Sequence, residues 1–87
     1  MYKLILLPAA RKFYEGLFYS DRVQFKRIAK AMDFLQTDPL NAGKPLRHDL
    51  KGKYSLRVGI YRIIYQVKQH EITVYILDIG HRRDVYQ

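Results

Sequence analysis

The sequence predicts an α+β domain with the order β-α-α-β-β-β, in which two N-terminal helices pack on one face of a small, mainly antiparallel sheet. Three observations favour this class. The chain opens on a short apolar run, apolar residues then recur at three- and four-residue steps, and the C-terminal half alternates apolar with polar residues. With 87 residues and neither an internal repeat nor a flexible linker, we expect a single domain over 1–87.

The N-terminal half predicts one strand and two helices. Residues 2–7 form an apolar run that ends at Pro8, and proline suits the first turn of a helix because no partner is needed there for an N–H. The apolar stripe of the first helix consists of Ala10, Phe13, Tyr14, Leu17 and Phe18. Ser20 and Asp21 are candidate N-caps for the second helix, which we expect to end before Asp38-Pro39. Its stripe consists of Phe25, Ile28, Met32 and Leu35.

The C-terminal half predicts a long loop followed by a three-stranded meander. Residues 38–53 contain two Pro and two Gly, which favours an ordered loop, and a loop of this length is uncommon unless it has a function. Alternation predicts strands over 53–58, 60–67 and 72–77. Gly59 marks the first turn and the polar residues 68–71 mark the second.

The first turn decides which side chains face one another. A two-residue turn at Val58-Gly59 would pair Arg57 with Ile60 and Ser55 with Arg62. A slip of one residue would bury two arginines, so the hydrophobic pattern supports this choice of faces.

This register predicts a basic face on the side of the sheet away from the helices. The second turn would put Thr73 and Tyr75 beside Arg62, which adds aromatic support to that face. We call it the basic face, and its members on the first two strands of the meander are Lys53, Ser55, Arg57 and Arg62.

Composition narrows the function further. Sixteen Lys and Arg against eight Asp and Glu give a net charge of +8, which favours a polyanionic partner over a charge that only maintains solubility. The absence of cysteine excludes a disulfide framework, a cysteine-ligated metal and a thiol nucleophile, and is compatible with the cytoplasm, where we expect the protein. No apolar run approaches the ~20 residues of a membrane-spanning helix.

Two groups of residues could carry chemistry. Arg62 lies in the middle of a predicted central strand, where an arginine needs a partner, and phosphate is a suitable bidentate one. The closing segment brings together two guanidiniums, an imidazole and a phenol, although charged runs are usually solvated surface. These residues are His81, Arg82, Arg83 and Tyr86. His48 and His70 have no companion at metal-ligand spacing, so we expect no metal or cofactor.

A second basic row, on the predicted second helix, has a plainer interpretation. Arg22, Lys26 and Lys30 follow i, i+4 spacing, which is typical of a solvated helix face.

Three stretches of the chain resemble the RelE toxins of the RelE/ParE superfamily. They are residues 44–53, 54–67 and 79–86, and the likeness covers essentially the whole chain. The Leu-Lys-Gly and Tyr-Arg-Ile-Ile-Tyr blocks are common to the superfamily, whereas the closing Gly-His-Arg-Arg-Asp-Val-Tyr resembles the RNA-cleaving branch. The resemblance implies a RelE-like fold and a ribosome-dependent mRNA endonuclease that cuts in the A site and is inhibited by a cognate antitoxin.

The resemblance also implies roles for individual residues. Arg62 would stabilise the transition-state phosphate, Arg82 would act near the leaving oxygen and Tyr86 in proton transfer, with His81 as the alternative shuttle. The residues implied to lie along the mRNA are Lys51, Lys53, Arg57 and Arg83. The chain departs from the family in having Ser55 where the best-known members have lysine, and in a shorter spacing from Arg82 to Tyr86. Whether Arg82 or Arg83 is the active arginine is left open.

These residue types suit a metal-independent cleavage in which a 2′-OH attacks its adjacent phosphate. Fixed guanidiniums neutralise the phosphorane, and the ribosome would supply the in-line geometry. Two alternatives remain open at this level. One is a ParE-like toxin that poisons gyrase, and the other is a ribosome- or RNA-binding module without catalysis.

Overall fold

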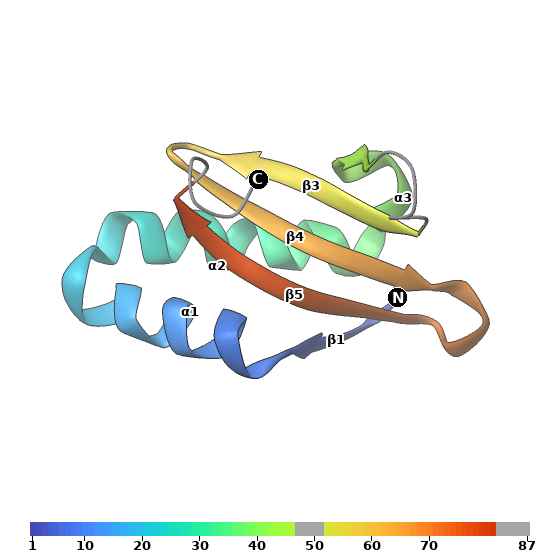
Figure 1. The fold of residues 1–87 in the computed structure, drawn as a ribbon, viewed down its shortest axis with the longest axis horizontal. Coiled ribbons are helices and arrows are strands. Elements are labelled where there is room, and N and C mark those ends of the chain that lie inside the picture. Colours follow the sequence, from blue (N-terminus) through green and yellow to red (C-terminus); the bar gives the residue numbers. More distant parts are fainter. Residues whose placement is uncertain (47–51, 82–87) are drawn as a thin grey trace.

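A five-stranded sheet covered on one face by two helices forms the protein in the computed structural model, which describes residues 1–46 and 52–81 (Figure 1). The helices are α1 (Pro8–Ser20), α2 (Arg22–Thr37) and the short α3 (Pro39–Ala42). The strands are β1 (Lys3–Leu6), β2 (Lys44–Pro45), β3 (Lys53–Val58), β4 (Tyr61–Lys68) and β5 (Thr73–His81). A 3-10 turn, η1 (Gln69–Glu71), joins β4 to β5. The α+β class and the two-helix layer are therefore confirmed.

The strand order is β1-β5-β4-β3-β2. The β3, β4 and β5 meander is antiparallel, as predicted, and β2 adds antiparallel to β3. By contrast, β1 pairs in parallel with β5, so the first and last strands of the chain are neighbours (Figure 1). Both edge strands are short, and β2 contains Pro45, which limits pairing with other chains.

The prediction of a loop over residues 38–53 was wrong in part. It contains α3 and β2, both too short for a periodic hydrophobic signal. They are held by tertiary contacts with the sheet rather than by their own propensity, as the site described below shows.

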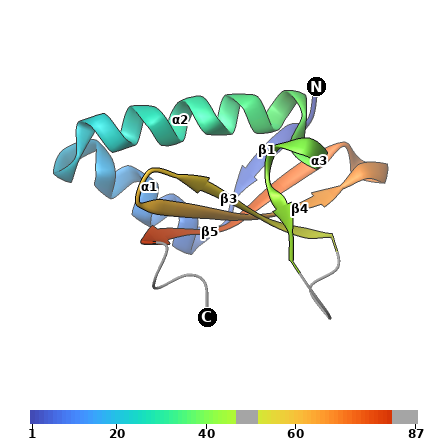
Figure 2. The same ribbon diagram turned by 90° about the horizontal axis from the view of Figure 1, so that it is seen from above.

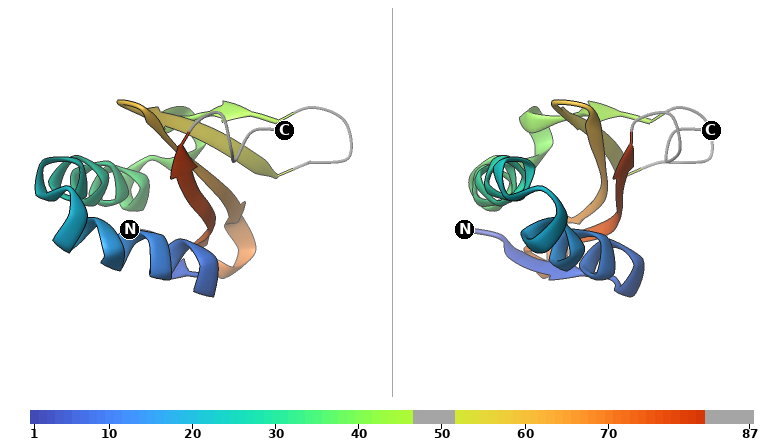
Figure 3. Two further views of the ribbon diagram at one scale, coloured as in Figure 1. Left: turned by 60° about the vertical axis from the view of Figure 1, so that its left-hand side comes forward. Right: turned by 90° about the vertical axis from the view of Figure 1, so that its left-hand side faces the viewer.

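Local sequence explains where the two long helices begin. Pro8 occupies the first turn of α1, and the Asp21 carboxylate caps α2 by accepting the Gln24 backbone N–H at 3.2 Å, as predicted. Both helices lie on one side of the sheet, with α1 packed along β5 (Figures 2 and 3). The buried core between these layers consists of Ala10, Leu17, Ile28, Met32, Leu35, Ile63, Tyr65, Val67, Val74, Ile76 and Ile79.

The turn between β3 and β4 lies one residue later than predicted. Gly59 has a positive φ of 61° and is the first central residue of the turn, so Val58 pairs with Tyr61 and Arg57 pairs with Arg62. The predicted pairing of Arg57 with Ile60 was wrong. Because the pairing shifts by two residues, every side chain keeps the face that the pattern predicted.

The neighbours of Arg62 on β5 also differ from the prediction. Gly80 lies opposite Arg62, whereas Tyr75 pairs with Gln66 and Thr73 with Lys68. The pairing shifts between Ile64 and Tyr65, where a bulge in β5 absorbs an extra residue. Aromatic support from Tyr75 is therefore at the far end of the sheet.

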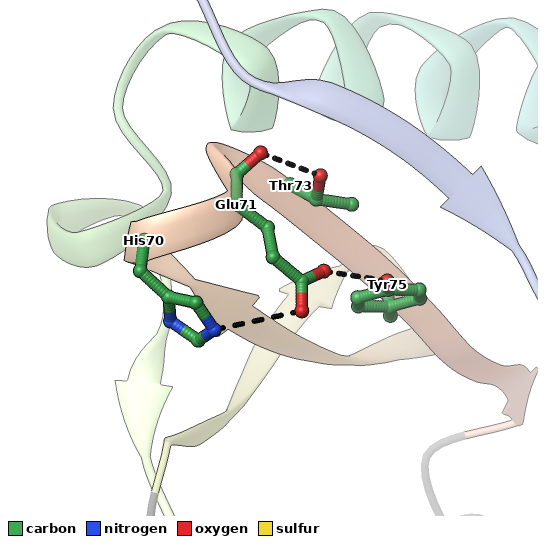
Figure 4. Close-up of polar contacts among 4 residues, drawn as sticks. All are labelled: His70, Glu71, Thr73 and Tyr75. Carbon is green, nitrogen blue, oxygen red and sulfur yellow. Dashed lines mark hydrogen bonds and ion pairs between the residues drawn. The ribbon is translucent and has the colours of Figure 1, made fainter.

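Polar contacts around η1 fix that far end (Figure 4). The Tyr75 hydroxyl donates to a Glu71 carboxylate oxygen at 2.8 Å, and His70 Nε2 lies 3.6 Å from the other oxygen. The hydrogen bond to the carboxylate raises the pKa of Tyr75. The Thr73 hydroxyl donates to the Glu71 carbonyl at 3.0 Å, so β5 begins in a defined turn.

Two absences are established for the described ranges, 1–46 and 52–81. They contain no helix long and apolar enough to cross a bilayer. They also contain no cluster of three or more side chains that could hold a metal ion.

Candidate functional site

Two arginines lie directly opposite each other on the basic face. Arg57 on β3 is the cross-strand partner of Arg62 on β4. Their chain neighbours Leu56 and Ile63 pack into the core, so both guanidiniums are on the side away from the helices. Like charges directly opposite in a sheet are destabilising. The pair becomes favourable when an anion lies against it, since guanidiniums bind phosphate oxygens in bidentate fashion.

Ser55 positions the Arg62 guanidinium. Arg62 Nη1 donates to Ser55 Oγ at 3.0 Å, and Ser55 is only 5% exposed. Because the hydroxyl is buried and its backbone belongs to a paired strand, the acceptor is fixed in space. Arg62 is half-buried, whereas Arg57 is exposed. One guanidinium is thus held and the other reaches into solvent.

A hollow of about 540 Å³ lies beside this pair. Its wall is the segment that contains α3 and the start of β2, and its floor is the basic face. The residues around it are Asn41, Ala42, Gly43, Lys44, Ser55, Leu56, Arg57 and Arg62. The hollow therefore combines three cationic side chains with an amide and a hydroxyl, a set suited to a polyanion backbone.

Tyr65, on the core side of the sheet, holds the wall segment in place through its hydroxyl. Its hydroxyl accepts the Gly43 N–H at 2.9 Å and donates to the Pro39 carbonyl at 2.7 Å. Its ring stacks on Tyr54 with centroids 5.3 Å apart. Burial raises the pKa of Tyr65 to about 12, so the hydroxyl keeps the proton that it donates to Pro39.

Gly43 is required by the close approach of the wall to the sheet. A Cβ at this position would lie 2.7 Å from the Ser55 carbonyl oxygen and 2.8 Å from the Tyr65 hydroxyl. No other residue would let β2 pair with β3 in this geometry without a shift of the backbone. Glycine here thus determines where the following residue, Lys44, enters the site.

The remaining predicted residues divide into three groups. Lys53 pairs with Gln66 and shares the basic face with Arg57 and Arg62, as predicted, but at the other end of β3. His81 pairs with Tyr61 at the end of β5, on the other side of the sheet from Arg62. The residues that lie outside the described part of the chain are Lys51, Arg82, Arg83 and Tyr86.

The His81 ring is directed toward an aromatic contact. It meets the Tyr61 ring edge to face, with centroids 6.4 Å apart, and Tyr61 in turn contacts Phe13 of α1 at 5.4 Å. This places His81 next to the helix layer. The register also puts Asp78 on the basic face, diagonally across from Arg62, as a carboxylate close to the cations.

Residues of the wall were not identified from the sequence. Lys44 and Asn41 lay in the expected loop, where nothing indicated that they would meet the basic face. One signal could have been used: a tyrosine at a core-facing strand position needs a partner for its hydroxyl, and Tyr65 finds two in this loop. By contrast, the predicted solvent exposure of Arg22, Lys26 and Lys30 is confirmed.

Comparisons with known proteins agree on one family. Residues 4–86 match the family model described as the ParE toxin of the type II toxin–antitoxin system parDE. Toxin RelG of Mycobacterium tuberculosis is 45% identical over 53 residues, which span 61% of each chain and so less than two thirds of RelG. Toxin RelE of the same organism is 40% identical over 70 residues, 76% of this chain and 72% of the relative.

Solved structures agree with the sequence relatives. The toxin–antitoxin complex RelBE2 from Mycobacterium tuberculosis contains a chain with a TM-score of 0.78 and 33% identity, covering 95% of this chain and 93% of that one. The intact RelBE complex of E. coli gives a TM-score of 0.77 at 25% identity, covering 93% and 96%. Because the family model matches nearly the whole of this chain, the protein is a member of the RelE/ParE superfamily of type II toxin–antitoxin toxins.

Proposed function

We propose that this toxin is a metal-independent, ribosome-dependent endoribonuclease that cleaves mRNA in the ribosomal A site and so inhibits translation. The observation that carries the proposal is the directly opposed pair of Arg57 and Arg62 beside the hollow, with Arg62 held by Ser55. Two guanidiniums side by side on one face, one of them held by Ser55, suit a phosphate ligand, which accepts hydrogen bonds from guanidiniums in bidentate fashion. The relatives named RelE and RelG support the RNA-cleaving branch.

The chemistry follows from the charges. When the 2′-OH attacks its adjacent phosphate, negative charge develops on the equatorial oxygens, and a guanidinium already held in place neutralises it without reorganisation. Arg62 takes this role. Gly80 is the partner of Arg62 and His81 is the partner of Tyr61, so the last described residues of β5 lie next to Arg62 in sequence register. The roles of Arg82 or Arg83 near the leaving oxygen and of Tyr86 in proton transfer are the ones that the resemblance to RelE toxins implies, and they are part of this proposal.

His81 is the weaker of the two candidates for proton transfer. Its ring contacts Tyr61 on the side of the helices, while Arg62 lies on the other face. We expect Tyr86→Phe to reduce cleavage more than His81→Ala. Primer extension on ribosome-bound message measures both variants. Undiminished cleavage in Tyr86→Phe together with a large loss in His81→Ala would reverse the assignment.

Replacement of Arg62 tests the central claim. Arg62→Ala removes the fixed guanidinium, and the loss of such a charge-stabilising donor lowers the rate roughly 100-fold or more. Lys30→Ala, on the exposed face of α2, removes one positive charge away from the site and should leave cleavage unchanged. If Arg62→Ala cleaves ribosome-bound mRNA like the unmodified protein, the proposed site is wrong.

Ribosome dependence is tested separately. The face provides fixed cations for charge stabilisation, and alignment of the 2′-OH with the phosphate is left to the ribosome as a positioning effect. We expect purified toxin to cut ribosome-bound message far faster than the same RNA without ribosomes. Equal rates on both would contradict this part of the proposal.

An antitoxin is the expected inhibitory partner. The solved relatives RelBE2 and RelBE are toxin–antitoxin complexes. An acidic or amphipathic antitoxin segment over the basic face would neutralise Arg57 and Arg62 and occupy the hollow. Its gene is expected next to the toxin gene, and stoichiometric addition of its product should abolish cleavage.

A gyrase-directed toxin is the second candidate, since the matching family model is described as a ParE toxin. Expression in cells followed by parallel translation and supercoiling assays separates the two functions. Loss of supercoiling with intact messages favours a gyrase-directed toxin, whereas cut messages with normal supercoiling favour the nuclease. A third outcome, ribosome binding with unchanged messages, indicates a binding module without catalysis.

A further inference from the structure

We propose that Lys44 is a further RNA-binding residue of this toxin and contacts a backbone phosphate next to the one held by Arg57 and Arg62. The inference rests on the proposed function, because it assigns a contact to the same substrate. Lys44 lines the hollow together with both arginines. It was not among the predicted site residues, since it lies in the segment expected to be a loop.

The strand register directs Lys44 toward the basic face. On β2, Lys44 is the cross-strand partner of Ser55, and paired residues in an antiparallel ladder point to the same side. Ser55 uses that side to accept the Arg62 guanidinium. Lys44 on β2 and Arg62 on β4 are thus on the same face as Ser55 and belong to the two strands that flank it.

The backbone on both sides of Lys44 is fixed. The Gly43 N–H is bonded to the Tyr65 hydroxyl, and the Leu46 N–H donates to the Lys53 carbonyl at 2.9 Å. Pro45, which pairs with Tyr54, restricts the chain further. The backbone of this exposed lysine is therefore fixed at the edge of the basic face, so its flexible side chain extends from a defined point.

The positions of the three cationic side chains around the hollow suit a ligand with more than one phosphate. Lys44, Arg57 and Arg62 come from β2, β3 and β4, and Lys44 is displaced by two residues along β3 from the Arg57–Arg62 pair, so the three form a diagonal row across the strands. Neighbouring strands are about 4.8 Å apart. A row that extends over two such spacings is longer than one phosphate group needs, and it fits successive phosphates of an extended single strand.

Salt dependence of binding tests this assignment. The probe is a fluorescently labelled 2′-O-methyl RNA oligonucleotide, which has the RNA backbone but no attacking hydroxyl. Its affinity is measured by anisotropy as a function of salt for the unmodified toxin, Lys44→Gln, Lys44→Arg and Lys30→Gln. Both glutamine variants lose one positive charge, so they differ only in where the charge was. Thermal unfolding of each variant verifies that the fold is retained.

Loss of one phosphate contact has a defined signature. For single strands, the negative slope of log affinity against log salt becomes shallower by about 0.7 for each phosphate contact that is lost. This corresponds to roughly fivefold weaker binding at 0.1 M salt. We expect this change in Lys44→Gln, and the unmodified slope in Lys44→Arg and Lys30→Gln. Equal slopes in Lys44→Gln and Lys30→Gln overturn the inference, and so does a failure of the unmodified toxin to bind the probe.

The two proposals fail in different ways. If the unmodified toxin cuts ribosome-bound mRNA but Lys44→Gln binds the probe like Lys30→Gln, the Lys44 contact is wrong and the nuclease function stands. If Lys44→Gln shows the expected loss while the unmodified toxin cuts no message, the RNA contact stands and the nuclease function is wrong.

Discussion

At the scale of single residues, the opposed pair of Arg57 and Arg62 lowers the stability of the fold and favours binding of an anion. The two guanidiniums face each other directly across β3 and β4, and like charges in this arrangement are destabilising. We predict that Arg57→Gln raises the free energy of unfolding by about 0.5 kcal/mol, within the range measured for cross-strand charge pairs. The same change weakens binding of the 2′-O-methyl RNA probe. Urea unfolding at low salt measures the first effect, and a destabilised Arg57→Gln variant would contradict it.

Ser55 provides a second prediction at this scale. Ser55→Ala removes the acceptor that holds Arg62 Nη1 but leaves the charge in place. A hydrogen bond to a charged group is worth about 1.5 kcal/mol at the lower end of its range, and we expect most of that loss in the transition state. The cleavage rate on ribosomes should therefore fall about tenfold.

The controls for Ser55→Ala separate positioning from charge. Probe binding should change little, because the Arg62 charge is retained. Ser20→Ala, an exposed serine at the end of α1, makes the same chemical change away from the site. A loss of probe affinity as large as the loss of rate would show that Ser55 contributes to binding itself and does not merely position Arg62.

Hydrophobic alternation was sufficient to assign side chains of the meander to faces, but not to pair them. Lys53, Arg57 and Arg62 lie on the predicted face because burial fixes the parity of each strand. Gly59 can occupy either central position of a two-residue turn, and the two choices differ by two residues in pairing while burying the same side chains. The tail candidates Arg82 and Tyr86 lie outside the described residues and stay predictions.

At the scale of elements, the segment with α3 and β2 could not be predicted because its structure is imposed from outside. A four-residue helix and a two-residue strand have no hydrophobic period to detect. Their position depends on the Tyr65 hydroxyl and on the space that Gly43 leaves for the sheet. The longer α1 and α2 were predictable because each has its own apolar stripe and its own start signal.

Removal of the Tyr65 hydroxyl should loosen this wall. Tyr65→Phe leaves the Gly43 N–H and the Pro39 carbonyl without their partner, and such unsatisfied groups cost about 1–3 kcal/mol. We expect lower stability to urea and faster hydrogen exchange at the Gly43 and Leu46 amides. Tyr54→Phe, which removes the hydroxyl from the ring stacked on Tyr65 and keeps the ring, is the matched control. Equal exchange in both variants would mean that the hydroxyl does not hold the wall.

The same hydroxyl predicts a dependence on alkaline pH. The pKa of Tyr65 is raised from 10.0 to about 12 by burial, so the folded protein holds this proton more tightly than the unfolded chain. The stability that Tyr65 contributes is fully present below pH 10 and is lost as the pH rises toward 12. Unfolding free energies at stepped pH should fall less steeply in this window for Tyr65→Phe than for the unmodified protein. Parallel curves would contradict the assigned pKa.

At the scale of the whole molecule, two surfaces carry part of the positive charge behind the net charge of +8. The exposed face of α2 contains Lys26 and Lys30 on the helix side, whereas Lys44 and Arg57 belong to the sheet side, beside the hollow. Self-repulsion among these charges destabilises the folded chain, and a bound polyanion relieves it. The two surfaces should therefore respond differently to an anionic ligand.

Thermal unfolding with the 2′-O-methyl RNA probe separates the two surfaces. At a probe concentration of 100 Kd, binding stabilises the folded state by about 2.7 kcal/mol, and for a domain of this size that raises Tm by roughly 11–22 °C. The double variant Lys44→Gln, Arg57→Gln should lose most of this increase, whereas Lys26→Gln, Lys30→Gln should retain it. Both remove two positive charges, so a general effect of net charge would lower the increase equally in the two. Only a phosphate-binding row on the sheet face makes them differ, and high salt should abolish the difference because the contacts with RNA phosphates are screened.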